Sequence, residues 1–99
     1  MLRKRRLDEP GKVEVTFELP PTFWADEIYV VGEFNDWNRQ ANPMDHLRDG
    51  SWSLTLVLNA DCEYEFRYLI DGRDWMGDPE ADTHRPNEHG ADNSVVSTD

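Results

Sequence analysis

Residues 12–19 read KVEVTFEL, and apolar side chains alternate there with polar or charged ones at every position. In an extended chain, Val13, Val15, Phe17 and Leu19 would lie on one face, with the two glutamates and the threonine on the other. This period of two predicts a strand with one buried face. The two prolines that follow predict its end.

Four other segments have the same extended character. Residues 51–58 (SWSLTLVL) and 61–70 (DCEYEFRYLI) alternate, residues 27–34 (EIYVVGEF) are apolar on both faces in their middle, and residues 93–98 (NSVVST) form a short last segment. Asn-Asp and Asp-Gly turn signals separate the segments, and no amphipathic helix stands out. The sequence therefore predicts an all-β, antiparallel β-sandwich, with a long irregular loop over residues 77–92.

Composition limits the function classes. The chain has 99 residues, which predicts one domain, and a formal net charge of −11. Such an acidic protein is not expected to bind nucleic acid or an anionic membrane surface, whereas a neutral ligand is compatible with it. No apolar run is long enough to span a bilayer. Cys62 is the single cysteine, so no internal disulfide forms, and we expect a cytoplasmic protein.

Basic residues concentrate at the start of the chain. The segment MLRKRR holds four of the ten lysines and arginines. It predicts a flexible, solvated basic tail over residues 1–11, ahead of a single domain over residues 12–98. The alternative is an arm that docks onto an acidic partner.

The four tryptophans fall into two groups. Trp52 lies on the apolar face of a predicted strand and is expected in the core, and Trp24 is expected to cap one end of the sandwich. Trp37 (FNDWNR) and Trp75 (GRDWMGD) follow turn signals among polar neighbours. A flat aromatic face suits the C–H face of a pyranose ring, so these two predict a sugar platform. The alternative is that either ring folds back over the core.

Several segments in combination resemble one family: GEFNDW, SWSLTLVL, YEFRYLIDGRDW, DPE and DNSVVS. Together they resemble the glycogen-binding carbohydrate-binding module of family 48, also called the isoamylase N-terminal or early-set domain, as in the β subunit of AMP-activated protein kinase. The resemblance covers residues 12–98. It implies an immunoglobulin-like early-set sandwich that binds α-1,4-linked glucan such as glycogen, starch or a maltooligosaccharide.

The resemblance also implies site residues. Trp37 and Trp75 correspond to the family's stacking rings, and Arg67 and Asn93 to the side chains that hydrogen-bond sugar hydroxyls. The alternation of residues 61–70 independently places Arg67 on the face opposite the core set. Without the resemblance, Arg67 would also be compatible with an ordinary solvated arginine paired with a neighbouring glutamate.

The sequence departs from the family pattern at three places. Arg67 stands where the kinase module has lysine, and one more residue separates Gly72 from Trp75 than in the shortest family form, which would displace the ring. The loop over residues 86–93 (PNEHGADN) lacks the apolar side chain that grips the ligand in the kinase module, and His89 stands near that place. These departures predict weak binding rather than a different fold.

Other functions are less compatible with the sequence. A glycosidase needs a cleft between paired carboxylates, and a domain of this size offers a surface, so we expect no enzyme activity. The aspartates of residues 71–82, with His84 and His89, match neither the spacing of a calcium loop nor that of a zinc site, so we expect no metal or cofactor. The serious alternative is a protein-interaction or regulatory docking module. It would have kept the early-set fold and would associate with a separately encoded glycogen-metabolising enzyme or kinase.

Overall fold

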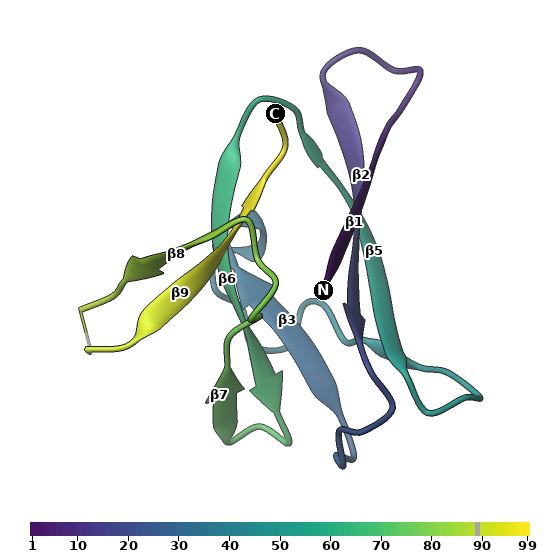
Figure 1. Cartoon of the computed structure of the whole chain (residues 1–99), viewed down its shortest axis with the longest axis vertical. Helices are drawn as coiled ribbons and strands as arrows, with labels where there is room; N and C mark the ends of the chain where they lie inside the picture. The colour runs from purple at the N-terminus through teal and green to yellow at the C-terminus, as the bar shows by residue number, and fades with distance from the viewer. Residues whose placement is uncertain (89) are drawn as a thin grey trace.

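The alternating segments form two antiparallel sheets, which Figure 1 shows in a computed structural model that describes residues 1–88 and 90–99. In chain order the elements are β1 (Leu2–Arg6), β2 (Lys12–Leu19), β3 (Ile28–Gly32), the 3₁₀ turn η1 (Glu33–Asn35), β4 (Asp45–His46), β5 (Trp52–Asn59), β6 (Glu63–Ile70), β7 (Asp74–Met76), β8 (Thr83–Pro86) and β9 (Asp92–Ser97). The first sheet has the order β1-β2-β5-β4 and the second β3-β6-β9-β8, with β7 also paired to β6. Within the described part of the chain, no helix is long and apolar enough to cross a membrane.

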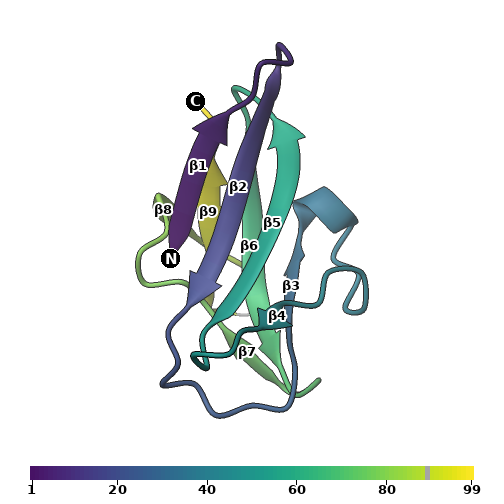
Figure 2. The same cartoon turned by 90° about the vertical axis from the view of Figure 1, so that its right-hand side faces the viewer.

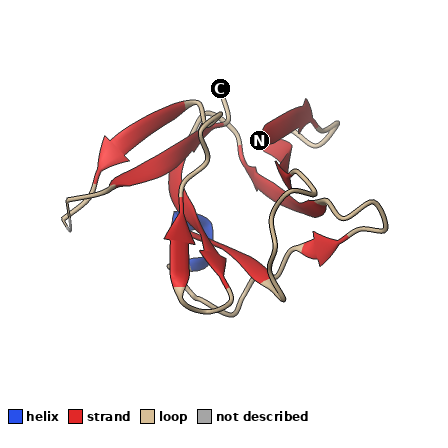
Figure 3. Cartoon of the chain, turned by 60° about the horizontal axis from the view of Figure 1, so that its bottom comes forward, coloured by secondary structure: helices blue, strands red, loops and turns tan. Residues whose placement is uncertain are grey.

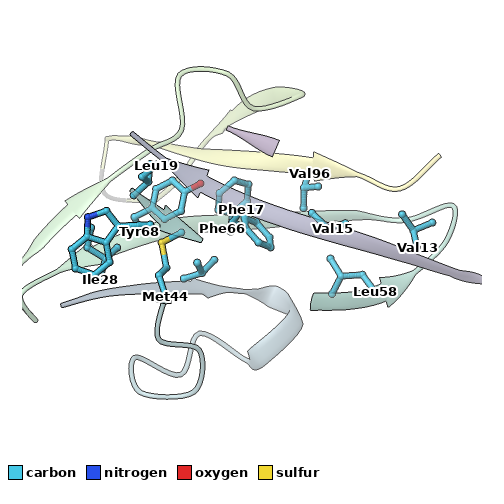
Figure 4. Packing of buried hydrophobic residues seen from close by; sticks show 12 residues of the cluster. Val13, Val15, Phe17, Leu19, Ile28, Met44, Leu58, Phe66, Tyr68 and Val96 are labelled. Atoms are coloured by element: carbon cyan, nitrogen blue, oxygen red, sulfur yellow. The ribbon is translucent and has the colours of Figure 1, made fainter. Parts of the chain in front are cut away.

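The core lies between the two sheets, which Figures 2 and 3 show from two further directions. Figure 4 shows the buried side chains of β2 and β6 meeting in this layer. The inward set predicted for β2 is buried, and the Phe17 ring packs edge to face against Phe66 with 5.1 Å between ring centroids. The predicted all-β antiparallel sandwich is confirmed, and its outer faces are left for other roles.

Two tryptophan predictions have different outcomes. Trp52 is in the core as predicted, 1% exposed and stacked on His46. The prediction for Trp24 is wrong, because its side chain is 96% exposed and caps nothing. Its neighbours Phe23 and Ala25 pack against the core instead. Because successive side chains of an extended segment point to opposite sides, Trp24 is directed outward.

The basic segment at the start of the chain forms β1, so the prediction of a flexible tail is wrong for residues 2–6. This strand pairs antiparallel with β2, and Leu2 packs against the core. Ion pairs join the strands, with Arg3 Nε 2.6 Å from a Glu18 oxygen and an Arg5 nitrogen 3.1 Å from a Glu14 oxygen. Backbone pairing to β2 therefore holds a strand whose own sequence does not alternate, and the exposed ion pairs add a small contribution. The domain boundary at residues 11 and 12 stays a prediction.

The region predicted as one long loop, residues 77–92, contains β8, which pairs with β9. Ahead of β8, the buried Asp78 joins the end of β7 to β9 and β6. Its backbone N–H donates to Ser94 Oγ at 2.7 Å, and its carboxylate accepts from the Tyr68 hydroxyl at 2.8 Å. Burial, the charge of Asp78 and this hydrogen bond together raise the pKa of Tyr68. The segment is therefore attached to the core by buried polar contacts rather than lying loose.

Candidate functional site

The outer face of β6 is the base of the site. The alternation that places Phe66 and Tyr68 in the core cluster directs Glu65, Arg67 and Leu69 to the opposite face of the sheet, where Leu69 is itself buried, at 3% exposed. Trp75 on β7 lies opposite Leu69 in the register and so shares this outer face. The sequence prediction that Arg67 faces away from the core agrees with this register.

At Arg67, strand β6 changes its neighbour on one side. Up to Phe66 it pairs with β9, and from Tyr68 onward it pairs with β7. The two partner strands therefore separate at Arg67, and we call this place the seam. Continuing the β6–β9 register by one residue brings Asn93 beside Arg67. The seam thus leaves the outer side of β6 without a continuous pair of neighbouring strands at Arg67.

The loop after β3 forms one wall, and Gly32 determines how closely it approaches β6. A Cβ added at Gly32 would lie 2.6 Å from the Glu65 carbonyl oxygen and 2.8 Å from the Phe66 Cβ. Any side chain there would push the strands apart. The following η1 turn directs Phe34 into the core layer, where its ring centroid is 5.6 Å from that of Phe17.

The amide of Asn35 fixes this loop. Its Oδ1 accepts from the Gly32 N–H at 3.1 Å, and its Nδ2 donates to the Val30 carbonyl at 3.0 Å and to Asn42 Oδ1 at 2.7 Å. Trp37 has a left-handed φ of 58°, and its N–H donates to the Gly32 carbonyl at 2.9 Å. The ring is consequently held out from the loop, with 38% of its side chain exposed.

A hollow of about 620 Å³ lies over the seam. All four residues that the sequence analysis singled out line it, namely Trp37, Arg67, Trp75 and Asn93, and they come from four separate elements or loops. The remaining lining residues are Glu33, Arg39, Glu65, Pro86, Asn87 and Glu88. The extra residue before Trp75 does not remove this ring from the hollow. His89 lies outside the described residues.

Two arginines are placed on the ring of Trp75. The guanidinium carbon of Arg39 is 5.3 Å from the ring centroid and that of Arg67 is 5.4 Å from it, both within the range of cation–π attraction. The Nε of Arg67 is buried and has no hydrogen-bond partner among the described residues. The indole is therefore held in place, and an arginine donor beside it is unused.

Carboxylates and amides alternate across the opposite side of the hollow. The Glu65 N–H donates to a Glu33 oxygen at 2.7 Å, and Asn93 Nδ2 donates to a Glu65 oxygen at 3.1 Å. Asn87 Nδ2 donates to Asn93 Oδ1 at 3.2 Å. Outside the hollow, a hydrogen bond from Arg85 to Glu63 raises the pKa of the Arg85 guanidinium. The wall thus presents both donors and acceptors, as a ligand with many hydroxyls requires.

The acidic residues give no sign of a metal site. Over residues 1–88 and 90–99, no group of three or more histidine, cysteine, aspartate or glutamate side chains is arranged to hold an ion. Asp71 instead accepts from the backbone N–H groups of Asp26 and Glu27 at 2.8 and 3.1 Å. This aspartate serves a turn, which is a common role for the residue type.

A family model described as the glycogen recognition site of AMP-activated protein kinase matches residues 14–99. The chain belongs to this family. Membership confirms the resemblance drawn from the sequence and gives the chain a carbohydrate-binding role, since the family is a recognition domain rather than a catalytic one.

Curated relatives of this glycogen-recognition domain include two branching enzymes. The 1,4-alpha-glucan-branching enzyme of Dictyostelium discoideum is 38% identical over 39 residues, which are 39% of this chain and 6% of the enzyme. The 1,4-alpha-glucan branching enzyme GlgB of Photobacterium profundum is 36% identical over 53 residues, which are 54% of this chain and 7% of the enzyme. The chain therefore spans less than a tenth of the length of these relatives.

Solved structures with the same fold include bacterial esterases. The enterochelin esterase of Shigella flexneri has a TM-score of 0.77 and 16% identity, and the match covers 98% of this chain and 32% of the esterase. The ferric enterobactin esterase of Salmonella typhimurium has a TM-score of 0.72 and 14% identity, covering 98% of this chain and 34% of the esterase. At such identities the likeness extends to the fold alone.

Sequence reasoning missed part of the hollow. Arg39 lies in a polar stretch with no alternation, and its position over Trp75 depends on the loop that Asn35 fixes. Glu33 and Glu65 resemble ordinary strand-end and surface glutamates. A signal did exist for Glu65, because it shares the outward face of β6 with Arg67.

Proposed function

We propose that the domain is a non-catalytic module that recognises α-1,4-linked glucan, such as glycogen or a maltooligosaccharide, in the hollow over the seam. Trp37 and Trp75 would stack on glucose rings, and Arg67 and Asn93 would hydrogen-bond the hydroxyls. The observation that carries this proposal is the convergence of these four residues. They are separated along the chain, and the sequence alone predicts all four as site residues.

The charges of the hollow favour a neutral ligand. Its lining contains two arginines and three glutamates, so a phosphate or carboxylate ligand would meet repulsion as well as attraction. A sugar hydroxyl both donates and accepts, and it suits a wall where amides and carboxylates alternate. The unused Nε donor of Arg67 supports the same role, because a buried donor without a partner is costly unless a ligand satisfies it.

Binding to a short oligosaccharide should be weak. The hollow is shallow and carries two rings and a few hydrogen bonds, which must offset the ordering of a flexible ligand. A branched polymer offers many chain ends and should bind better through repeated contacts. We also propose that the domain associates with a separately encoded glycogen-metabolising enzyme. This association is independent of how the hollow binds sugar.

Native affinity electrophoresis with and without glycogen in the gel tests the proposal. We expect wild type to be retarded by glycogen, and Trp37→Ala and Trp75→Ala to migrate freely. Val57→Ala is the matched control, because Val57 is an exposed apolar residue on the other sheet and should keep the retardation.

Absence of retardation for wild type would refute the proposal. The folded state of each variant is checked by circular dichroism. Trp37 is 38% exposed, so its removal should cost only about 1–2 kcal/mol of stability, less than for a fully buried ring. If Trp37→Ala unfolds the domain, the ring belongs to the core and the site assignment is wrong.

A further inference from the structure

Trp24 is the most exposed large apolar side chain that the structure describes. Its side chain is 96% exposed, whereas tryptophan is on average one of the more buried residue types. Trp24 belongs to the loop between β2 and β3, and this loop runs at the bottom of Figures 1 and 2. The hollow does not include it. Both faces of this indole are therefore open to a ligand.

The loop that carries Trp24 is fixed on both sides of the ring. Before it, the Phe23 N–H donates to the Pro20 carbonyl at 3.5 Å, and the Phe23 side chain packs against the core. After it, the N–H groups of Asp26 and Glu27 both donate to one Asp71 oxygen, and the Asp71 N–H donates back to the Glu27 carbonyl at 2.9 Å. An exposed ring on an anchored loop loses little conformational freedom when it binds.

The size of this apolar surface decides between a protein and a sugar as the occupant. A specific protein interface needs about 800 Å² from each partner, whereas one aromatic side chain offers about 150–250 Å². Among the described residues, the other exposed large apolar side chains are Trp37 in the hollow, Val57 on β5 and Leu47, and next to Trp24 in the chain the exposed Pro21 and the partly exposed Phe23 add only a small apolar area. A single open ring matches one pyranose.

The anchoring also connects Trp24 to the hollow. Asp71 holds the Trp24 loop and begins the turn between β6 and β7, and four residues later this hairpin carries Trp75. We propose that Trp24 is a second contact for the same α-glucan polymer, stacking on a glucose of a longer or neighbouring chain while the hollow holds another. This inference rests on the proposed function.

Two ligands of different length test it. Wild type, Trp24→Ala, Trp24→Phe and Trp37→Ala are compared for maltotriose affinity by titration and for retention on glycogen by affinity electrophoresis. We expect Trp24→Ala to keep maltotriose affinity within twofold and to lose at least tenfold in apparent glycogen affinity, because only the polymer can reach both contacts. Trp24→Phe, which keeps a ring, should recover most of the loss, and Trp37→Ala should lose both ligands.

The outcomes separate the two proposals. If Trp37→Ala loses glycogen and Trp24→Ala does not, the second contact is refuted and the proposed function stands. If wild type binds neither ligand, both are refuted. Because Trp24 makes no burying contact, its variants should fold as wild type does. If light scattering finds a wild-type dimer that Trp24→Ala abolishes, the ring joins two copies of the chain and the sugar contact is refuted.

Discussion

Replacing Gly32 with alanine should destabilise the fold by a steric route alone. The glycine has φ −167° and ψ −173°, an extended conformation that any residue adopts. The added Cβ would nevertheless lie 2.6 Å from the Glu65 carbonyl oxygen. That oxygen belongs to the backbone of β6, so it cannot rotate away as a flexible side chain would.

The size of the effect follows from this distance. To reach the ordinary contact distance of 3.4 Å, β3 and β6 must separate by about 0.8 Å at this point, the difference between 3.4 and 2.6 Å. Overpacking a tight site costs about 1–3 kcal/mol, and here it also loosens the end of a hydrogen-bonded ladder, so we expect about 3 kcal/mol. For a domain of this size, that lowers the melting temperature by roughly 12–24 °C.

Urea unfolding followed by tryptophan fluorescence measures this loss, with Gly11→Ala as the control. Gly11 has φ +79°, and a Cβ there would have no atom within 4 Å, so its substitution costs only backbone strain of about 1–2 kcal/mol. Gly32→Ala should also weaken glycogen binding, because the Gly32 carbonyl holds Trp37. If Gly32→Ala is no more destabilising than Gly11→Ala, the close approach of β3 to β6 does not limit the fold.

Three further predictions concern single side chains. Burial and Asp78 raise the pKa of Tyr68, so the folded protein keeps a proton that the unfolded chain releases above pH about 10. The free energy of unfolding should therefore fall by about 1.4 kcal/mol per pH unit above that pH. Urea midpoints measured across this range should lose that slope in Tyr68→Phe, and an unchanged slope would contradict the linkage. Asn35→Ala should cost about 2 kcal/mol of stability, because it leaves partly buried partners without their hydrogen bonds. It should also weaken glycogen retention more than tenfold. Normal retention would show that the Asn35 amide does not position the loop. Arg39→Ala should weaken maltoheptaose binding about fivefold in a titration, because Arg39 lines the hollow and restrains the Trp75 ring, and it should lower stability by about 1 kcal/mol or less, the size of a cation–π contact at an exposed site. Arg73→Ala, outside the hollow, should alter neither.

The fold could be predicted wherever burial imposes alternation on the sequence. Residues 12–19 and 61–70 alternate because each strand has one face in the core, and both became the strands expected. The start of the chain could not be predicted in this way. Its strand is held by backbone pairing to β2 with added charge pairs, and pairing between distant residues leaves no local period. Trp24 was placed wrongly because its neighbour Phe23 occupies the packing position.

The residues of the candidate site also differ in how far the sequence could predict them. Trp37 and Trp75 could be selected because large rings among polar turn residues are unusual. Arg39 could not, because its position over Trp75 is a product of the loop geometry. The importance of the seam could not be foreseen either, since the point at which β6 exchanges one neighbour for another depends on where β7 ends and β9 begins.

The seam has a consequence for how this domain can change. The hollow lies over a point where two strands diverge, and part of its lining comes from side chains that belong to neither strand. Arg39 and Glu88 lie outside the strands and the core, and their replacement should leave the strands beneath the hollow intact. Substitutions at these rim positions can therefore change which ligand the hollow prefers, while the strands beneath it stay the same. A small library restricted to rim positions should accordingly yield folded variants with new ligand preferences.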